Sequence, residues 1–251
     1  MRLLALLLVL GLTPGLMPAA LADGGKPKFG PDAVPVTTAN DYLRSSPAPD
    51  YWKLAPFYLP QATGSACTVA SVAMALNFLR GVPPGTEDPL VTSAGLLTAV
   101  ADPSWTERAA EDGPGLRFDE LVTEVTASLR AYGLERDVTV ETFRPRDASP
   151  DSLARLRAVL SVNEASDRDV VLAYFNQGVL TGDWDGPHVS PLGAFDAARG
   201  RVLVMDVDRE WYVPYWSPEA RLLDAMLKPA PAGMGSLAGE TGGLIWLKPA
   251  R

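Results

Sequence analysis

The chain has one cysteine and one histidine among its 251 residues, and both lie in surroundings suited to covalent catalysis. Cys67 begins an apolar helical pattern that continues to Leu76. The positive end of a helix favours the thiolate, which is the nucleophilic form of cysteine. His188 lies at the start of a predicted strand, in the segment GPHVSP. Because an imidazole can act as general base and acid for a thiol, a Cys–His mechanism would have to use these two residues.

Two further polar residues could complete an acyl-transfer site. Asp206 follows His188 by 18 residues, on the second strand of a predicted hairpin whose turn lies near Ala198. In that register Asp206 shares a face with His188 and could fix its tautomer, whereas a shift of one residue would separate them. Gln61 lies six residues before Cys67 and could place its amide beside the Cys67 backbone N–H as an oxyanion donor.

Other chemistries fit the sequence less well. One cysteine and one histidine cannot form a closed structural zinc site without carboxylates, and no ligand spacing indicates one. No glycine-rich phosphate loop follows a predicted strand. The segment 183–186 has the first residues of a calcium loop but not its later ligands, so we interpret it as a polar turn.

The N-terminal residues predict export. Residues 1–22 combine a basic start, an apolar core and an Ala-Leu-Ala cleavage site, which is typical of a secretory signal peptide. We therefore expect a periplasmic or secreted protein whose mature chain begins at Asp23, with an uncleaved anchor as the alternative. No later segment has the apolar length of a membrane span. The formal charge of −8 and the lack of a basic cluster disfavour nucleic acid as a partner.

The order of predicted elements indicates one α+β domain. Residues 23–50 are predicted to be an extended lead-in, and 51–251 the catalytic domain. Helices are expected over 67–80, capped by Thr63 or Ser65, and over 118–132 and 151–160, with shorter ones between 86 and 115. Strands are expected at 170–175, 188–195, 201–207 and 244–247. Helices that precede strands favour α+β over alternating α/β.

Several of these segments resemble the phytochelatin synthase family, which is a papain-like group of glutathione-processing enzymes. The resemblance covers about 51–81 and 116–226. Its motifs are the region of Gln61 and Cys67, the stretch 183–193 around His188, and VLVMDVDR at 202–209. Downstream residues that also match are Tyr212, Pro214, Trp216, Leu222, Leu223, Ala225 and Met226.

The resemblance implies a papain-like fold in which a nucleophile helix packs against a C-terminal antiparallel sheet. It also implies Cys67 as nucleophile, His188 as base, Asp206 as orienting acid and Gln61 as oxyanion donor. Thr68 and Pro187 stand where the family usually has glycine, which puts the identity of the substrate in question. We expect Thr68, together with Ser190 and Arg209, to contact the substrate. The chain resembles the short bacterial form, without the cysteine-rich C-terminal extension of eukaryotic members.

These observations lead to one main hypothesis and two rivals. The main hypothesis is hydrolysis of the Cys–Gly bond of glutathione, or of a related thiol peptide, through a γ-glutamylcysteinyl thioester, with transfer to longer phytochelatins less favoured. The rivals are a peptidase or amidase with another peptide substrate, and an inactive secreted binding protein. No cofactor and no metal site are expected, although heavy-metal ions or metal–thiolate complexes remain open as activators. The sequence does not set the oligomeric state, and a homodimer is one of the states it allows.

Overall fold

A seven-stranded antiparallel sheet forms the centre of the part of the chain that the computed structural model describes, residues 29–81 and 89–250. The predicted signal peptide lies outside these residues. The strands are β1 (Val34–Pro35), β2 (Val138–Phe143), β3 (Val170–Asn176), β4 (Pro187–Asp196), β5 (Arg201–Val204), β6 (Tyr215–Pro218) and β7 (Gly243–Pro249). Their order across the sheet is β1-β6-β5-β4-β3-β7-β2, and neighbouring strands run antiparallel.

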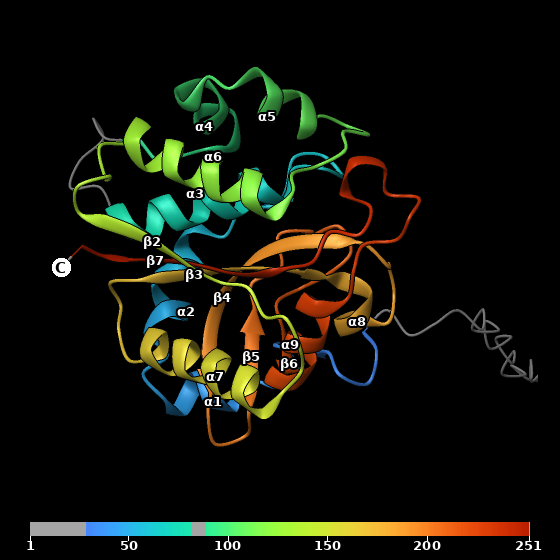
Figure 1. The fold of residues 1–251 in the computed structure, drawn as a ribbon. Helices are drawn as coiled ribbons and strands as arrows, with labels where there is room; N and C mark the ends of the chain where they lie inside the picture. The colour runs from blue at the N-terminus through green and yellow to red at the C-terminus, as the bar shows by residue number, and fades with distance from the viewer. Residues whose placement is uncertain (1–28, 82–88, 251) are drawn as a thin grey trace, which may run out of the picture.

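Helices cover both faces of this sheet (Figure 1). They are α1 (Asp41–Ser45), α2 (Pro49–Leu54), α3 (Cys67–Arg80), α4 (Ser93–Val100), α5 (Pro103–Arg108), α6 (Phe118–Ala131), α7 (Pro150–Glu164), α8 (Gln177–Thr181) and α9 (Glu219–Leu227), with short 3-10 turns at Ala55–Phe57 and Gly235–Leu237. Helices α3 to α6 lie on one side of the sheet, and α7 and α9 lie on the other (Figure 1). The α+β class predicted from the sequence is confirmed.

Strand β3 shows why its apolar run forms a central strand. All seven of its residues are buried, and successive side chains enter two different cores. Val170 and Leu172 pack into the core that contains α3 and α6, while Val171 and Ala173 pack into the core that contains α7 and α9. A strand with helices on both faces needs apolar residues at every position, because side chains alternate between the faces.

Helix α3 is the central helix of the first core. Eleven of its fourteen residues are buried, and it packs against β3 and β4. Its apolar residues therefore point in most directions, as expected for a helix enclosed by its neighbours. The helix ends at Gly81, whose φ of 72° few other residues adopt readily. Burial on nearly all sides fixes the position of its first residue, Cys67.

The predicted helices at 67–80, 118–132 and 151–160 and the strands at 170–175, 188–195 and 244–247 are confirmed within a few residues. The lead-in is corrected. Instead of being extended throughout, residues 34–54 form β1, α1 and α2, and β1 adds to the sheet edge through the pairs Val34–Trp216 and Pro35–Tyr215. The sequence analysis did not identify β2, β6, α8 or α9, because these elements are short or amphipathic in isolation.

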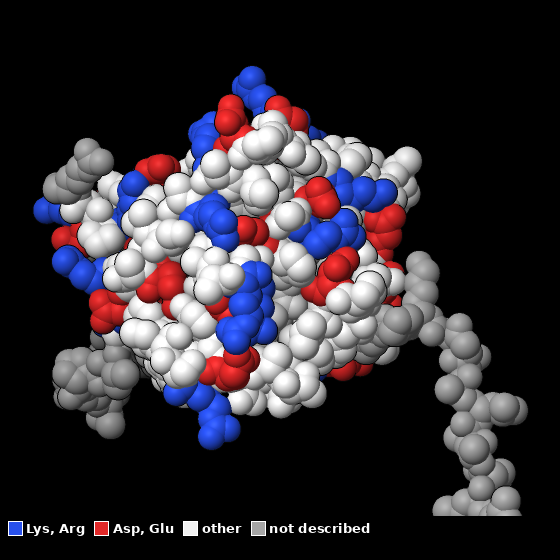
Figure 2. Space-filling model, turned by 90° about the horizontal axis from the view of Figure 1, so that it is seen from below, with Lys and Arg blue, Asp and Glu red and all other residues white. Residues whose placement is uncertain are grey.

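Two properties of the described residues bear on partners. In 29–81 and 89–250, no helix has the length and apolar character needed to cross a membrane. The face shown in Figure 2 carries Lys and Arg side chains interspersed with Asp and Glu, with no continuous basic patch on that face.

Candidate active site

Cys67 is the first residue of α3, as the sequence predicts. The predicted cap is wrong: no side chain of the described residues caps this helix, and the residue before Cys67 is Ala66. Thr63 and Ser65 instead donate to the carbonyls of Ala109 and Gly113, at 2.7 and 2.6 Å. These two bonds hold the loop before the helix against the loop after α5. The first N–H groups of α3 therefore remain available beside the thiol.

His188 lies on β4 and faces Asp206, which follows β5. The distance from His188 Nε2 to Asp206 Oδ1 is 3.0 Å, and both side chains are buried. Ser190 Oγ also lies 3.0 Å from Nε2 and accepts a bond from the Val207 N–H. The Cys67 side chain also acts on the ring and raises its pKa. Since Nε2 faces Asp206, Nδ1 is the ring nitrogen left for Cys67.

The electrostatics of this group favour a charged imidazole. Burial by itself would lower the pKa of His188, but the Asp206 carboxylate and the Cys67 side chain raise that pKa to about 10. Burial opposes the ionisation of Asp206, whereas the charge of His188 and bonds from His188, Gln177 and the Asp208 N–H hold the pKa of Asp206 below its ordinary value. The arrangement therefore stabilises an ionised carboxylate beside an imidazolium at neutral pH.

A β-bulge brings His188 and Asp206 to the same face of the sheet. The hairpin starts with the pairs Asp196–Arg201 and Phe195–Val202, a register in which Asp206 would be opposite Pro191. Between Leu192 and Ala194 the register shifts by one residue, so that Leu192 pairs with Val204. The shift aligns Asp206 with the alternate positions of β4 that include His188, because side chains alternate along a strand.

Gln177 is a site residue that the sequence analysis missed. It is the first residue of α8, it is 1% exposed, and its Nε2 donates to Asp206 Oδ2 at 2.9 Å. The Asp208 N–H donates to the other carboxylate oxygen at 2.9 Å, and the Tyr58 hydroxyl donates to the Asp206 carbonyl. No local pattern around Gln177 signals this role, since it depends on the approach of α8 to the end of β5.

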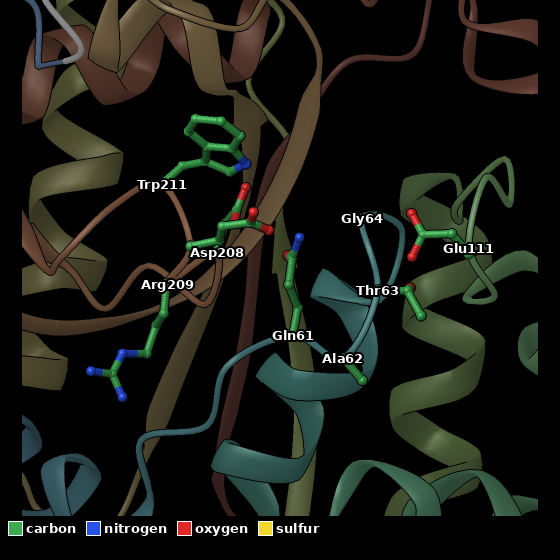
Figure 3. Close-up of a pocket in the computed structure, with 9 residues that line it drawn as sticks. Gln61, Ala62, Thr63, Gly64, Glu111, Asp208, Arg209 and Trp211 are labelled. Carbon is green, nitrogen blue, oxygen red and sulfur yellow. The ribbon is translucent and has the colours of Figure 1, made fainter.

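Gln61, the oxyanion donor expected from the sequence, is anchored through its backbone. Its backbone N–H donates to the Val207 carbonyl at 2.8 Å, and it lines the same cleft as Cys67 and His188. Its side chain extends between Asp208 and the loop at Gly64 (Figure 3). The Oε1 atom is buried without a hydrogen-bond partner among the described residues. The backbone of Gln61 is thus held in place, whereas its side-chain oxygen has no hydrogen bond to another described residue.

The cleft over Cys67 has a volume of about 470 Å³. Exposed indole rings of Trp184 and Trp211 lie on its lining, and Pro187 contributes to it as well. A smaller hollow of about 310 Å³ adjoins the cleft and shares Gln61, Glu111 and Asp208 with it, and the Gln61 side chain points towards Asp208 (Figure 3). The combined space is large enough for a tripeptide-sized ligand.

The three residues expected to contact the substrate have different environments. The expectation for Thr68 is wrong: its side chain is 2% exposed and its Oγ1 accepts from Trp105 Nε1 at 3.0 Å, inside the first core. Ser190 is fully buried and contacts His188 rather than the cleft. Arg209 lines the adjoining hollow, but its guanidinium lies over the Tyr58 ring, 4.8 Å from the ring centroid.

Comparison with known proteins agrees with this geometry. The family model described as phytochelatin synthase matches residues 35–233, which include the candidate site and most of the sheet. The chain belongs to the phytochelatin synthase family. This membership confirms the resemblance found in the sequence, and it extends the match to the α4 and α5 region that the motifs did not cover.

Two plant members of the phytochelatin synthase family illustrate the relationship. The glutathione gamma-glutamylcysteinyltransferase 3 of Lotus japonicus is 25% identical over 190 residues, which are 70% of this chain and 34% of the relative. The glutathione gamma-glutamylcysteinyltransferase 2 of Arabidopsis thaliana is 26% identical over 200 residues, 74% of this chain and 38% of the relative. The matched region spans little more than a third of these relatives.

Within 29–81 and 89–250, no group of three or more His, Cys, Asp or Glu side chains could hold a metal ion. Chemically, the arrangement could supply a nucleophile from Cys67, a proton carrier from the His188–Asp206 pair, and donors for a developing oxyanion from Gln61 and the α3 N-terminus.

Proposed function

We propose that this protein cleaves the Cys–Gly bond of glutathione, or of a closely related γ-glutamyl thiol peptide, through a thioester on Cys67. The observation that carries the proposal is the position of His188, which lines the same cleft as Cys67 and has its Nε2 3.0 Å from the Asp206 carboxylate. Membership of the phytochelatin synthase family and the transferase names of its relatives support glutathione as the substrate class.

The residues suggest a two-step reaction. The Cys67 thiolate attacks the carbonyl carbon of the cysteinyl residue, and the negative oxygen accepts bonds from the Cys67 N–H and the Gln61 amide. His188 gives its proton to the glycine nitrogen, the C–N bond breaks, and glycine leaves. Water, activated by His188, then attacks the thioester and releases γ-glutamylcysteine. An amine of a second peptide in place of water would give transfer, and we favour hydrolysis.

The test measures glycine release from glutathione and the mass of the protein. Wild-type protein should release glycine and, when quenched early, carry one γ-glutamylcysteinyl group on Cys67. Cys67→Ala should lose both, because the nucleophile carries the covalent route. Thr68→Ser, at the residue next to Cys67, is a matched control, since the smaller side chain keeps a hydroxyl that can accept from Trp105. Glycine release that persists in Cys67→Ala would refute the proposal.

One feature of the cleft favours the rival peptidase or amidase activity. Its lining includes four carboxylate side chains, from Glu111, Asp112, Asp183 and Asp208, and neither Lys nor Arg. Glutathione carries two carboxylates, so such a lining would favour peptides whose carboxylates are masked or replaced by cationic groups. The kcat/KM for glutathione, its C-terminal amide and a cationic C-terminal amide separates the two. Our leading proposal expects glutathione to be the best substrate, and a tenfold preference for a cationic amide would favour the rival.

The inactive binding protein is tested by thiol reactivity. A functional site should alkylate at Cys67 faster than a free thiol at pH 6, because the imidazolium beside it favours the thiolate. His188→Gln should remove this advantage while leaving the protein folded. Equal rates in both proteins would indicate a cysteine without catalytic activation.

A further inference from the structure

Gln177 is a buried polar residue to which the proposed reaction gives no role, although it contacts Asp206. It is nine-tenths or more buried, it lies on the inner lining of the cleft with Cys67 and His188, and its Nε2 donates to Asp206. The backbone of Gln177 is fixed from both sides, since its N–H donates to the Gly186 carbonyl at 2.8 Å and its carbonyl accepts from Thr181 Oγ1 at 3.0 Å.

The bonds around Asp206 divide between its two carboxylate oxygens. Oδ1 faces His188 and accepts from the Asp208 N–H, while Oδ2 accepts from Gln177. Without a donor on Oδ2, the carboxylate could rotate and move Oδ1 away from the imidazole. A fully buried carboxylate oxygen without a donor would also be costly. The Gln177 amide therefore restricts both the orientation and the ionisation of Asp206.

An amide suits this position better than a charged donor. The Tyr215 hydroxyl lies 3.5 Å from Gln177 Oε1, so glutamine offers a donor to Asp206 and an acceptor to Tyr215 on one side chain. A lysine or arginine would bring a second positive charge to Asp206 and compete with the imidazolium of His188. A neutral donor leaves the full negative charge of Asp206 for His188.

We propose that Gln177 is a positioning residue of the Cys67–His188–Asp206 centre, where it holds Asp206 Oδ2 so that Oδ1 remains on His188. The geometric part of this inference stands on the contacts of Gln177. The effect on turnover rests on the proposed function. Gln177 contacts neither reacting atom through its amide nitrogen, so its influence would pass through Asp206.

The test uses the fact that His188 is the one histidine of the chain, so its ring gives a single set of NMR signals. The charged groups that act on this ring are Asp206 and Cys67. The titration is therefore followed in full-length Cys67→Ala protein, where no thiolate contributes. Adding Gln177→Met, which keeps the length of the side chain and removes the donor, should lower the midpoint of the His188 titration by about one pH unit.

Two further variants make the result specific. In Gln177→Glu the new carboxyl group shares a proton with Asp206 and so provides an O–H donor. The midpoint of the His188 titration should therefore return most of the way to its value in the parent protein. Asn163→Leu removes another buried amide, which donates to Asp169 and to none of His188, Asp206 and Gln177, and it should leave the His188 titration unchanged. A midpoint that is the same in Gln177→Met as in the parent would overturn the inference. If Gln177→Met does not fold, the Gln177→Glu protein decides. A His188 midpoint about one pH unit below that of the parent protein would then overturn the inference.

With Cys67 present, Gln177→Met should lower kcat for glycine release roughly 10- to 100-fold and change KM little, as expected when an outer partner of a catalytic histidine is lost. The two readouts separate the two proposals. If wild-type protein releases no glycine while the midpoint still responds to Gln177, the proposed function fails and the positioning role stands.

Discussion

The catalytic centre depends on a few buried polar contacts rather than on a large network. His188 is held between Asp206 and Ser190, and Asp206 is held by Gln177 and the Asp208 N–H. Each contact restricts the rotation of a side chain that must keep its orientation when Cys67 reacts. Because the imidazole is buried, its charge depends mainly on Asp206 and Cys67 rather than on solvent.

Asp206→Asn tests the third member of the centre. The substitution conserves volume but can present a donor to His188 where an acceptor is needed. In a serine triad, the equivalent change lowers turnover about 10⁴-fold. A thiolate–imidazolium pair depends less on the third residue, so we expect a loss on the order of 10- to 10³-fold in glycine release. Full activity in a folded Asp206→Asn protein, judged by its melting temperature, would remove Asp206 from the mechanism.

Asp50 illustrates a buried group that lowers stability. It lies on α2, is 1% exposed, and neither of its carboxylate oxygens has a partner among the described residues. Burial, with the nearby charges of Asp169 and Glu164, raises the pKa of Asp50 to about 10. The unfolded chain ionises this group at about pH 4, whereas the folded chain retains the proton. The contribution of Asp50 to stability therefore falls as pH rises from about 4 towards 10.

Asp50→Asn should accordingly increase the free energy of unfolding at pH 7, by up to about 4 kcal/mol. Asparagine is neutral in both states, so the unfolded chain no longer gains stability by ionising at this position. The gain should shrink as the pH is lowered to 4. Denaturant unfolding at several pH values measures it, with Asp137→Asn as the control, because Asp137 is exposed and is not among the groups that act on Asp50. A gain that does not change between pH 4 and 8 would show that Asp50 ionises normally in the folded protein.

The elements that carry the site meet at one end of the sheet. Helix α3 supplies Cys67, β4 supplies His188, the chain after β5 supplies Asp206, and α8 supplies Gln177. Loops that are far apart in sequence are joined by short bonds, such as those from Thr63 and Ser65 to the loop after α5. The bulge in β4 is the feature on which the alignment of His188 with Asp206 depends.

Gly193→Ala tests the bulge. A Cβ at Gly193 would lie 2.7 Å from Met205 Cγ and 2.9 Å from its Sδ, and Met205 is buried one residue before Asp206. Met205 would have to move, so we expect a loss of about 1–3 kcal/mol in stability together with a fall in glycine release. Gly233→Ala is the control, because no atom lies within 4 Å of its added Cβ. Equal activity and stability in the two variants would contradict a role of the bulge.

The molecule as a whole combines two cores on a shared sheet with a cleft at one end. The first core contains α3 and α6, the second contains α7 and α9, and alternating side chains of β3 enter both. The central sheet therefore couples the position of the nucleophile helix to that of His188 and Asp206. Trp184 and Trp211, both about half exposed, lie on the lining of this cleft.

Export is the prediction that concerns the entire chain. The N-terminal pattern of residues 1–22 leads us to propose a periplasmic or secreted protein. Intact mass of the protein recovered from a secreting host should place the mature N-terminus at Asp23. Stable full-length chain found in the cytosol alone would contradict this proposal.

The sequence by itself determined which two residues a Cys–His mechanism would have to use, because it offers one cysteine and one histidine, and the apolar patterns predicted α3 and β3 correctly. These features are encoded locally, in residue type and period. The tertiary structure alone decided that Thr68 faces the core and that Gln177 contacts Asp206. It also decided that a bulge aligns Asp206 with His188. Such contacts join segments distant in sequence, and their geometry follows from how helices and strands pack rather than from any local pattern.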